Sequence, residues 1–596
     1  MKKNNSPESP FKISLSQHIW QQKYRWVESG EVRDQTIEDT WQRVARALAA
    51  NEVNKVNWQD AFLKALQSFS FLPGGRILAN AGTTHRATLL NCFVMGTLGD
   101  SMEGIFEGLK EGALTMQQGG GVGYDFSPLR PKGFLAHATG RVASGPVSFM
   151  RIWNTMCATI LTVGARRGAM MATLRCDHPD IEDFITAKSF SGELKHFNLS
   201  VLVTDAFMQA VEKDEMWLLV FPVEKGDDAA GEYVERRWSG QSEVTRCRVC
   251  RKIRARDLWK KILKQTYEYS EPGVLFIDRI NQQNNLWYDE QITATNPCGE
   301  IPLPPYGACN LGSVNLTQFI LDPFRSSAAF DFAKLQSMIG VYVRMLDNVL
   351  DISHYPLGQQ RAQVLKARRI GLGLTGLGDA LTMLNLNYGD DKACEWASSV
   401  MKMICHEAYR ASIQLAQEKG SFPQFDRAKF LEGAFVQTLP LDIQQGIFDF
   451  GLRNSHLTAI APTGTISLLA NNVSSGIEPI FATEYSRKIL QQNDRFKDYV
   501  VRDFARQIWE EVYPGAPMPQ HMVTAYDLSP KVHLKMQAAL QPYVDNSISK
   551  TINVPKALSF DDFAMVYDWA FKLNLKGCTT YRESDVRGSV LSSGPS

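Results

Sequence analysis

The sequence predicts a mixed α/β fold that follows a small helical region. Residues 34–50 carry apolar side chains at the spacing of an amphipathic helix. Farther along, strand-like apolar runs at residues 273–277 and 457–461 alternate with long segments at residues 332–350 and 391–419 that predict helices. Strands that alternate with helices are typical of α/β domains.

The N-terminal region differs from the rest of the chain in its polarity and in the spacing of its apolar residues. Residues 1 to about 12 are polar, and we expect them to be disordered. The helix that follows places four apolar residues on one face: Ile37, Trp41, Val44 and Leu48. From about residue 70, glycine-rich loop signals separate short apolar runs, without an internal repeat or a long linker. We therefore expect a helical region at residues 1–69 and one large domain at residues 70–596.

Composition argues against several classes of function. The 596 residues are 44% hydrophobic and 21% charged, which is ordinary for a globular protein. With 64 basic and 63 acidic residues the formal net charge is +1, so no basic field favours a nucleic-acid polymer as a partner. We see no signal peptide and no apolar run near the roughly eighteen residues of a membrane helix. Ten cysteines in so long a chain fit a reducing cytoplasm, so we expect a cytoplasmic protein without membrane contact.

The most informative motif is the run Asn296-Pro297-Cys298-Gly299-Glu300. It sets an amide, a thiol and a carboxylate within five residues, and these groups suit hydrogen bonding, nucleophilic or radical chemistry, and proton transfer. In an extended loop over a substrate, the side chains of Asn296, Cys298 and Glu300 would point the same way. A Pro-Gly turn around a buried structural thiol is the alternative.

Two further thiols, Cys92 and Cys309, are candidates for a redox pair near this motif. Cys92 lies in an apolar, strand-like run, and Cys309 follows Cys298 by eleven positions. Two thiols that meet in a reducing compartment can cycle between dithiol and disulfide and supply two electrons to a substrate. The alternative is that each thiol is a small buried apolar group.

A candidate anion site lies at residues 457–467. This segment runs from an expected strand through a Pro-Gly turn with hydroxyl side chains into an expected helix. Such a turn presents backbone N–H groups and hydroxyls to an anion at the helix N-terminus, which favours phosphate binding. An ordinary capped helix start is the alternative.

Two other motifs have simpler interpretations. Residues 371–376 match GxGxxG, but residues 359–369 before them are helical in character, so we interpret the glycines as close backbone packing rather than a nicotinamide site. Cys247 and Cys250 form one CxxC in the charged stretch 225–256, which we expect to be a surface insertion. An incidental pair and a surface redox pair both stay open, whereas a zinc site lacks a second ligand pair. No histidines are spaced as a metal-binding pair, so no protein-built metal centre is indicated.

Nine segments between about residue 70 and residue 582 occur in an order known from one family. They are residues 71–76, 91–93, 119–126, 166–174, 177–180, 296–300, 309–311, 461–467 and 577–582. In this order they resemble the catalytic subunit of ribonucleotide reductase, and specifically its adenosylcobalamin-dependent class II. The Asn-Pro-Cys-Gly-Glu run favours class II, and residues 577–582 lack the tyrosine pair that relays a radical from a metal-containing partner. The resemblance implies a ten-stranded α/β barrel with a radical cysteine on a loop inside it.

The resemblance implies a role for each catalytic candidate. Cys298 would be the thiyl radical that abstracts the ribose 3′-hydrogen, and Glu300 would accept the 3′-hydroxyl proton. Asn296 would hydrogen-bond the sugar. Cys92 and Cys309 would form the reducing pair, with Cys92 placed to protonate the departing 2′-hydroxyl.

The resemblance also implies nucleotide contacts. The implied contacts to the ribonucleotide substrate, its phosphates included, are Asn91, Gly121, Pro462, Thr463, Gly464, Thr465 and Ile466. A deoxynucleotide effector would bind at the interface of a homodimer. The implied effector contacts, together with the loop that carries the effector's signal, are Asp100, Ser101, Arg130, Arg167 and Gly168.

The family also implies a cofactor and a reductant. Adenosylcobalamin would supply the radical without a metal ligand from the protein, and a thioredoxin-like protein would supply electrons. Many relatives carry a CxxC tail that re-reduces the active-site pair; the chain stops at Ser596 without one, so we expect that tail to be missing or to lie on a separate chain. The nearest alternative is a class I large subunit that needs a separate radical-generating metalloprotein. A nucleotide-binding regulatory protein without catalysis is the alternative from another class.

Overall fold

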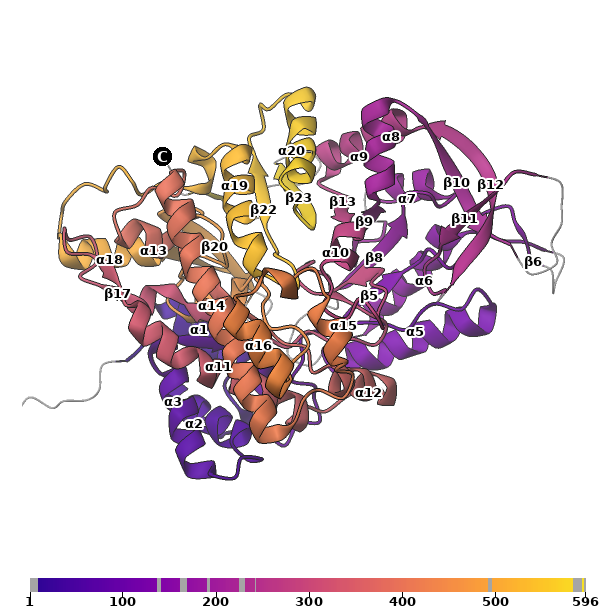
Figure 1. The fold of residues 1–596 in the computed structure, drawn as a ribbon. Helices are drawn as coiled ribbons and strands as arrows, with labels where there is room; N and C mark the ends of the chain where they lie inside the picture. Colours follow the sequence, from indigo (N-terminus) through magenta and orange to yellow (C-terminus); the bar gives the residue numbers. More distant parts are fainter. Residues whose placement is uncertain are drawn as a thin grey trace, which may run out of the picture.

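The protein is a mixed assembly of helices and sheets (Figure 1). The computed structural model describes residues 9–136, 141–160, 169–189, 193–223, 231–241, 243–490, 496–582 and 592–593. Their helices pack around two main β-sheets, so the predicted α/β class is confirmed. Within these ranges, no helix has the length and apolar character that crossing a membrane requires.

The N-terminal helices form the small helical region that the apolar spacing predicts. Helix α2 (Ile37–Leu48) begins at a capping box, in which Thr36 and Asp39 each accept the other's backbone N–H. Its apolar face is buried, and it packs with α3 (Lys55–Leu66) against the long helix α11 (Phe332–Ile352), at the lower left of Figure 1. The predicted helix at residues 34–50 is therefore confirmed.

The larger sheet has seven strands in the order β22-β23-β13-β9-β8-β5-β4. Neighbours from β4 to β13 are parallel, β13 and β23 are antiparallel, and β23 and β22 are parallel. The strands in chain order are β4 (Cys92–Val94), β5 (Gly121–Asp125), β8 (Met170–Arg175), β9 (Phe197–Val203), β13 (Gly273–Phe276), β22 (Thr551–Val554) and β23 (Gly577–Arg582). Because the central strands are buried almost throughout, they appear in the sequence as continuous apolar runs.

The smaller sheet has the order β19-β16-β3, formed by β3 (Phe71–Pro73), β16 (Leu311–Asn315) and β19 (Gly371–Thr375). Single β-bridges connect the two sheets: Phe93 pairs with Ala308 at one edge, and Leu372–Thr458 and Ile460–Ile548 pairs lead towards β22 at the other. No continuous ladder closes the sheets into a barrel within the described ranges. The strand predicted at residues 457–461 is confirmed only in part, because it pairs through those isolated bridges.

Both long helices are where the sequence predicts them. Helix α11 extends two residues beyond the predicted end at residue 350, and α14 (Asp391–Lys419) has the predicted bounds. The helix α14 ends because Gly420 adopts a positive φ of 83°, a conformation that glycine accepts at little cost.

The GxGxxG motif lies on a strand rather than on a phosphate-binding turn. Residues 358–367 before it form α12 (Gly358–Ala367), and the motif itself begins as β19. A side chain on Gly373 would collide with the carbonyl oxygen of Ala459. Close backbone packing, the interpretation favoured by the sequence, is confirmed.

The charged stretch at residues 225–256 is more ordered than an insertion loop. Its described part forms β11 (Tyr233–Arg237) and β12 (Val244–Arg254), which join β10 (Met216–Pro222) in an antiparallel sheet at one end of the molecule (Figure 1). Cys247 is fully buried there beside Trp238. The expected surface insertion stays compatible with this sheet, because β11 and β12 are largely exposed: their outward-facing residues are polar while inward-facing ones pack.

Candidate active site

The Asn-Pro-Cys-Gly-Glu run forms the tip of a β-hairpin. Strand β14 (Ala294–Thr295) pairs with β15 (Pro302–Leu303), and the loop between them is a tight turn in which the Gly299 N–H donates to the carbonyl of Asn296 (3.1 Å). Gly299 has a φ of 83°. The Asn296 side-chain oxygen accepts the Ile301 N–H (3.1 Å), which braces the turn from inside. The loop is therefore held by its own hydrogen bonds.

Neighbouring strands fix the position of this loop. A side chain at Gly123, on β5, would collide with the carbonyl of Thr295, so only glycine lets the hairpin approach. The Asn198 amide, on β9, donates to the carbonyl of Pro297 (2.8 Å), and the Ser547 N–H donates to the carbonyl of Glu300 (3.0 Å). Contacts from three separate segments hold the loop tip inside the molecule.

The turn changes which side chains share a face. The sequence leaves open a loop whose three polar side chains point the same way and a Pro-Gly turn around a buried thiol. The run forms a tight turn, with Gly299 at a positive φ, but its thiol is exposed. Cys298 is exposed and lines the central cavity together with Glu300. Asn296 is buried and does not line that cavity, although its Nδ2 atom has no hydrogen-bond partner among the described residues.

Cys92 and Cys309 lie opposite each other on adjacent segments. The antiparallel bridge between Phe93 and Ala308 puts the two cysteines in register, and the Cys309 N–H donates to the Cys92 carbonyl (2.8 Å). Their thiols also interact, and burial together with the Cys92 contact raises the pKa of Cys309 well above its usual value. Cys309 is fully buried, whereas Cys92 is half-buried and lines the cavity. Both cysteines are reduced and adjacent, as a dithiol requires.

Glu300 is a buried carboxyl with unused hydrogen-bonding capacity. Only 3% of its surface is exposed, and within the part of the chain that the structure describes its Oε2 atom has no hydrogen-bond partner. Burial raises the pKa of Glu300 to about 7, and the nearby Asn296 amide offsets this only partly. A carboxyl with a pKa near neutrality can accept a proton and release it again at the same pH.

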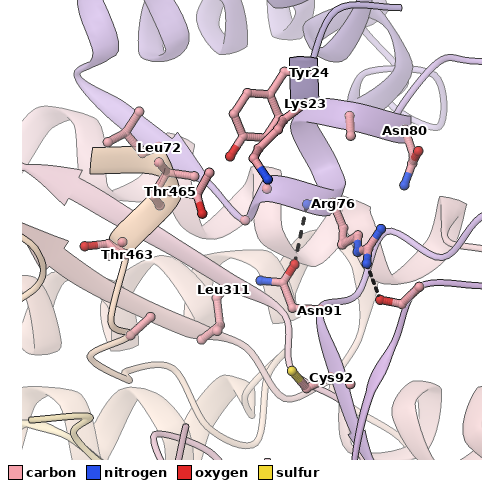
Figure 2. Close-up of a pocket in the computed structure, with 18 of the residues that line it drawn as sticks. Lys23, Tyr24, Leu72, Arg76, Asn80, Asn91, Cys92, Leu311, Thr463 and Thr465 are labelled. Atoms are coloured by element: carbon pink, nitrogen blue, oxygen red, sulfur yellow. Dashed lines mark hydrogen bonds between the residues drawn. The ribbon is translucent and has the colours of Figure 1, made fainter. Parts of the chain in front are cut away.

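Cys92, Cys298 and Glu300 line one cavity of about 760 Å³. Figure 2 shows the part of it around Asn91 and Cys92. Its lining includes the following sequence-predicted residues: Asn91, Cys92, Gly121, Cys298, Glu300, Pro462, Thr463, Gly464, Thr465 and Ile466. A side chain on Gly121 would approach the Cys92 sulfur to 3.0 Å, so the glycine leaves room for that thiol. Segments separated by more than 350 positions thus share one cavity.

The hydroxyl-rich turn enters this cavity at the start of α17 (Gly464–Leu469). Thr463 adopts a left-handed conformation, with a φ of 55°. Its hydroxyl oxygen accepts the Gly476 N–H (2.8 Å) and also bonds the hydroxyl groups of Thr375 and Ser467. The Thr463 hydroxyl therefore serves to hold the turn, while the first backbone N–H groups of the helix face no intrahelical acceptor.

The three described effector candidates, Asp100, Ser101 and Arg130, do not line the cavity. Arg130 donates from its side-chain Nε to Asp100 (2.8 Å), and its backbone N–H donates to the same carboxylate (3.0 Å). Ser101 caps α5 (Met102–Gln117) by accepting the Gly104 N–H. The structure brings Asp100, Ser101 and Arg130 together, whereas Arg167 and Gly168 lie outside the described residues.

Comparisons with known proteins match nearly the whole chain. The family model described as "Ribonucleotide reductase, barrel domain" matches residues 90–581, and "Ribonucleotide reductase, all-alpha domain" matches residues 13–86. The chain belongs to the ribonucleotide reductase large-subunit family. A vitamin B12-dependent ribonucleoside-diphosphate reductase of Mycobacterium tuberculosis is 37% identical over 92% of this chain and 76% of its own length.

Two further relatives extend the comparison within ribonucleotide reductases. The vitamin B12-dependent ribonucleoside-diphosphate reductase of Thermoplasma acidophilum is 35% identical over 94% of this chain and 70% of its own length. The ribonucleoside-diphosphate reductase subunit alpha of Chlamydia muridarum is 28% identical over 92% of this chain and 56% of its own length. Identity is therefore higher to the B12-dependent reductases than to this subunit alpha.

Several lining residues of this ribonucleotide reductase chain have no local sequence signal. The backbone N–H of Arg76 donates to Asn91 (3.4 Å) and its guanidinium donates to the carbonyl of Gly119, so it braces two cavity loops (Figure 2). Residues 21–27, from the N-terminal helical region, also line the cavity. In the sequence, Arg76 is marked only as the last residue of the family-like segment 71–76, and residues 21–27 belong to no motif.

The CxxC cysteines are distant from this chemistry. Cys247 and Cys250 lie on β12, where they pack with Val220 and Trp238, and neither lines the cavity. Burial raises the pKa of Cys247 to about 12 and that of Cys250 to about 11, which disfavours the reactive thiolate. Within the described ranges, no cluster of histidine, cysteine and carboxylate side chains could hold a metal ion.

Proposed function

We propose that the chain reduces ribonucleoside diphosphates to 2′-deoxyribonucleoside diphosphates by thiyl-radical chemistry. The observation that carries this proposal is the convergence in one cavity of an exposed thiol, Cys298, a carboxyl with a pKa near 7, Glu300, and a half-buried thiol, Cys92, paired with Cys309. The names of the most similar relatives supply the substrate class: ribonucleoside diphosphates.

Each thiol has a separate role in this proposal. The Cys298 radical abstracts the ribose 3′-hydrogen, and Glu300 accepts the 3′-hydroxyl proton. Cys92 protonates the departing 2′-hydroxyl, which leaves as water, and Cys92 and Cys309 become a disulfide as the sugar gains two electrons. Cys298 finally returns the 3′-hydrogen. Loss of the 3′-hydrogen and of the 3′-hydroxyl proton oxidises the sugar only transiently, because Cys298 returns the hydrogen and Glu300 returns the proton. The net change is a two-electron reduction of the substrate, for which the dithiol is the reductant.

The remaining contacts orient the nucleotide. Asn296 braces the loop, and in this proposal its amide hydrogen-bonds the sugar; the same amide acts on the Glu300 carboxyl, whose pKa it lowers. The phosphates bind at residues 462–466, while Asn91 and Gly121 contact the sugar side of the substrate. Support comes from their common position on the cavity wall.

The radical source in this proposal is adenosylcobalamin. The residues present fit such a group, because Cys298 is exposed at the loop tip and a side chain at Gly299 would meet nothing within 4 Å. Cys298 and Gly299 would face the cofactor, which when bound supplies an organic radical able to take the thiol hydrogen. The loop's hydrogen bonds hold Cys298 in place for that transfer, and burial of Cys309 keeps the second thiol protonated.

The assembly around the site belongs to the same proposal. We place the domain boundary between residues 69 and 70, and assign the two sheets to one ten-stranded barrel whose edges meet at the isolated bridges.

A deoxynucleotide effector binds at Asp100, Ser101 and Arg130, with Arg167 and Gly168 carrying its signal, in a homodimer that covers exposed apolar residues of α5 such as Phe106. A cytoplasmic, thioredoxin-like reductant, or a separate chain with further redox cysteines, restores the dithiol.

The decisive experiment supplies the chain with adenosylcobalamin, a ribonucleoside diphosphate and dithiothreitol, and measures the deoxynucleotide formed. We expect product without any added protein. A reaction that begins only when a metal-containing radical subunit is added would establish the class I alternative. Effector binding without product under either condition would establish the noncatalytic regulatory alternative.

A further inference from the structure

One wall of the cavity comes from the end of the N-terminal helix α1 (Ser14–Lys23). This helix is seated on the segment that carries the phosphate-binding turn: the Ser16 hydroxyl donates to the carbonyl of Leu468 (2.6 Å). Just before the helix, the Lys12 N–H donates to the side chain of Asn471 (2.7 Å), and that side chain donates to the carbonyl of Pro10 (2.9 Å). The beginning of α1 is therefore held against the end of α17, the helix that starts at the phosphate-binding turn, and the last turn of α1 lines the same cavity as residues 462–466.

The cavity carries an excess of positive charge. Its basic lining residues are Lys23, Arg25 and Arg76, and its one acidic lining residue is Glu300, on the catalytic loop. The whole chain has a net charge of only +1, so this excess is local. A positively charged cavity in a nearly neutral protein favours an anionic ligand.

The phosphate-binding turn has no charge of its own. Residues 461–467 contain no ionisable side chain, and the Thr463 hydroxyl is occupied by three contacts within the protein. A diphosphate seated there loses water around several negative charges, which is costly unless a cation comes close. The compensating cation must come from another segment.

Lys23 is the cation best placed for this purpose. Arg76 donates to the carbonyl of Gly119, and Figure 2 shows its guanidinium pointing away from Thr463 and Thr465. Lys23 is half-buried at the last turn of α1, and its ammonium group points into the cavity that Thr465 also lines (Figure 2). A lysine ammonium offers three donors on a flexible stem, which suits a terminal phosphate.

We propose that Lys23 binds the terminal phosphate of the substrate and makes the site select nucleoside diphosphates over monophosphates and nucleosides. This rests on the proposed function, which puts the substrate phosphates at residues 462–466. It also gives the helical N-terminal region a direct part in substrate recognition. Lys23 binds and orients the nucleotide and takes no part in the radical steps.

The test compares equilibrium binding of CDP, CMP and cytidine to the full chain without cofactor. Lys23→Met loses one charge-assisted hydrogen bond to the phosphate, so its CDP binding should be weaker than that of the wild type by roughly tenfold or more. CMP binding should fall less, cytidine binding should not change, and Lys23→Arg should regain most of the CDP affinity. Lys55→Met, which removes an exposed lysine outside the cavity, is the matched control and should bind CDP like the wild type.

Two results would overturn the assignment of Lys23. One is wild-type CDP affinity in Lys23→Met; the other is an equal loss of CDP and cytidine binding, which indicates a structural role. A measurement on the wild type needs no variant: CDP should slow acetylation of Lys23, followed by mass spectrometry, more than cytidine does, and equal rates would refute the contact. If the wild type binds CDP and makes product, but Lys23→Met keeps its CDP affinity and CDP does not slow acetylation of Lys23, only the assignment of Lys23 fails. A wild type without CDP binding or product refutes the proposed function as well.

Discussion

The buried carboxyl of Glu300 makes the stability of the protein depend on pH in a defined direction. Burial raises its pKa from 4.5 to about 7, so the fold favours the protonated form. At 1.36 kcal/mol per pKa unit, ionising Glu300 in the folded state costs about 3 kcal/mol. The penalty is absent well below pH 4.5, grows as the pH rises between the two pKa values, and is complete above pH 7.

Glu300→Gln keeps the shape of the side chain and removes the charge. We expect the variant to be more stable than the wild type by about 3 kcal/mol at pH 8, with most of that difference developing between pH 5 and pH 7. Denaturant unfolding at several pH values measures this difference in the free energy of unfolding. Glu432→Gln, at an exposed position, is the matched control and should show little pH-dependent difference.

The same variant tests the catalytic role. Glutamine cannot accept the 3′-hydroxyl proton, so turnover should fall by roughly 100-fold or more. In the wild type, activity should rise with pH and level off above an apparent pKa near 7, as Glu300 ionises. A stability difference that does not depend on pH, or a wild type more stable than the variant at pH 8, would refute the assignment of a raised pKa.

Three further substitutions test the thiols and their packing. Cys298→Ser should abolish deoxynucleotide formation while CDP binding stays at the wild-type level, because serine cannot form the radical. Cys92→Ser or Cys309→Ser should block repeated turnover, measured as product per enzyme in the presence of dithiothreitol. Gly121→Ala should lower kcat by roughly tenfold or more, because its new methyl group would lie 3.0 Å from the Cys92 sulfur; Gly358→Ala, in open space, should not.

Each of these outcomes has a clear contrary result. Activity in Cys298→Ser would remove that thiol from the mechanism. Repeated cycling in Cys92→Ser would show that the reducing electrons come from elsewhere. Wild-type kcat in Gly121→Ala would mean that the Cys92 thiol can shift without consequence.

Local patterns predict the long helices well. The helices α2, α11 and α14 follow from apolar spacing, because a helix brings residues three and four apart onto one face regardless of the rest of the chain. The helical character of the residues before the GxGxxG motif indicates correctly that the motif is not a nicotinamide-binding turn. Local spacing does not reveal the two strands within residues 225–256, nor the direction that the chain takes at Gly299 within residues 296–300.

The sequence by itself determined which groups are available: a thiol and a carboxyl on one loop, two more cysteines far away, and an uncharged hydroxyl-rich turn. Only the tertiary structure decided how they meet. It set Cys92 opposite Cys309, buried Glu300 until its pKa approached 7, and brought Lys23 of the first helix to the cavity. Contacts across hundreds of positions depend on strand register and helix packing, and desolvation depends on every neighbour, so neither can be deduced from the spacing of residues along the chain.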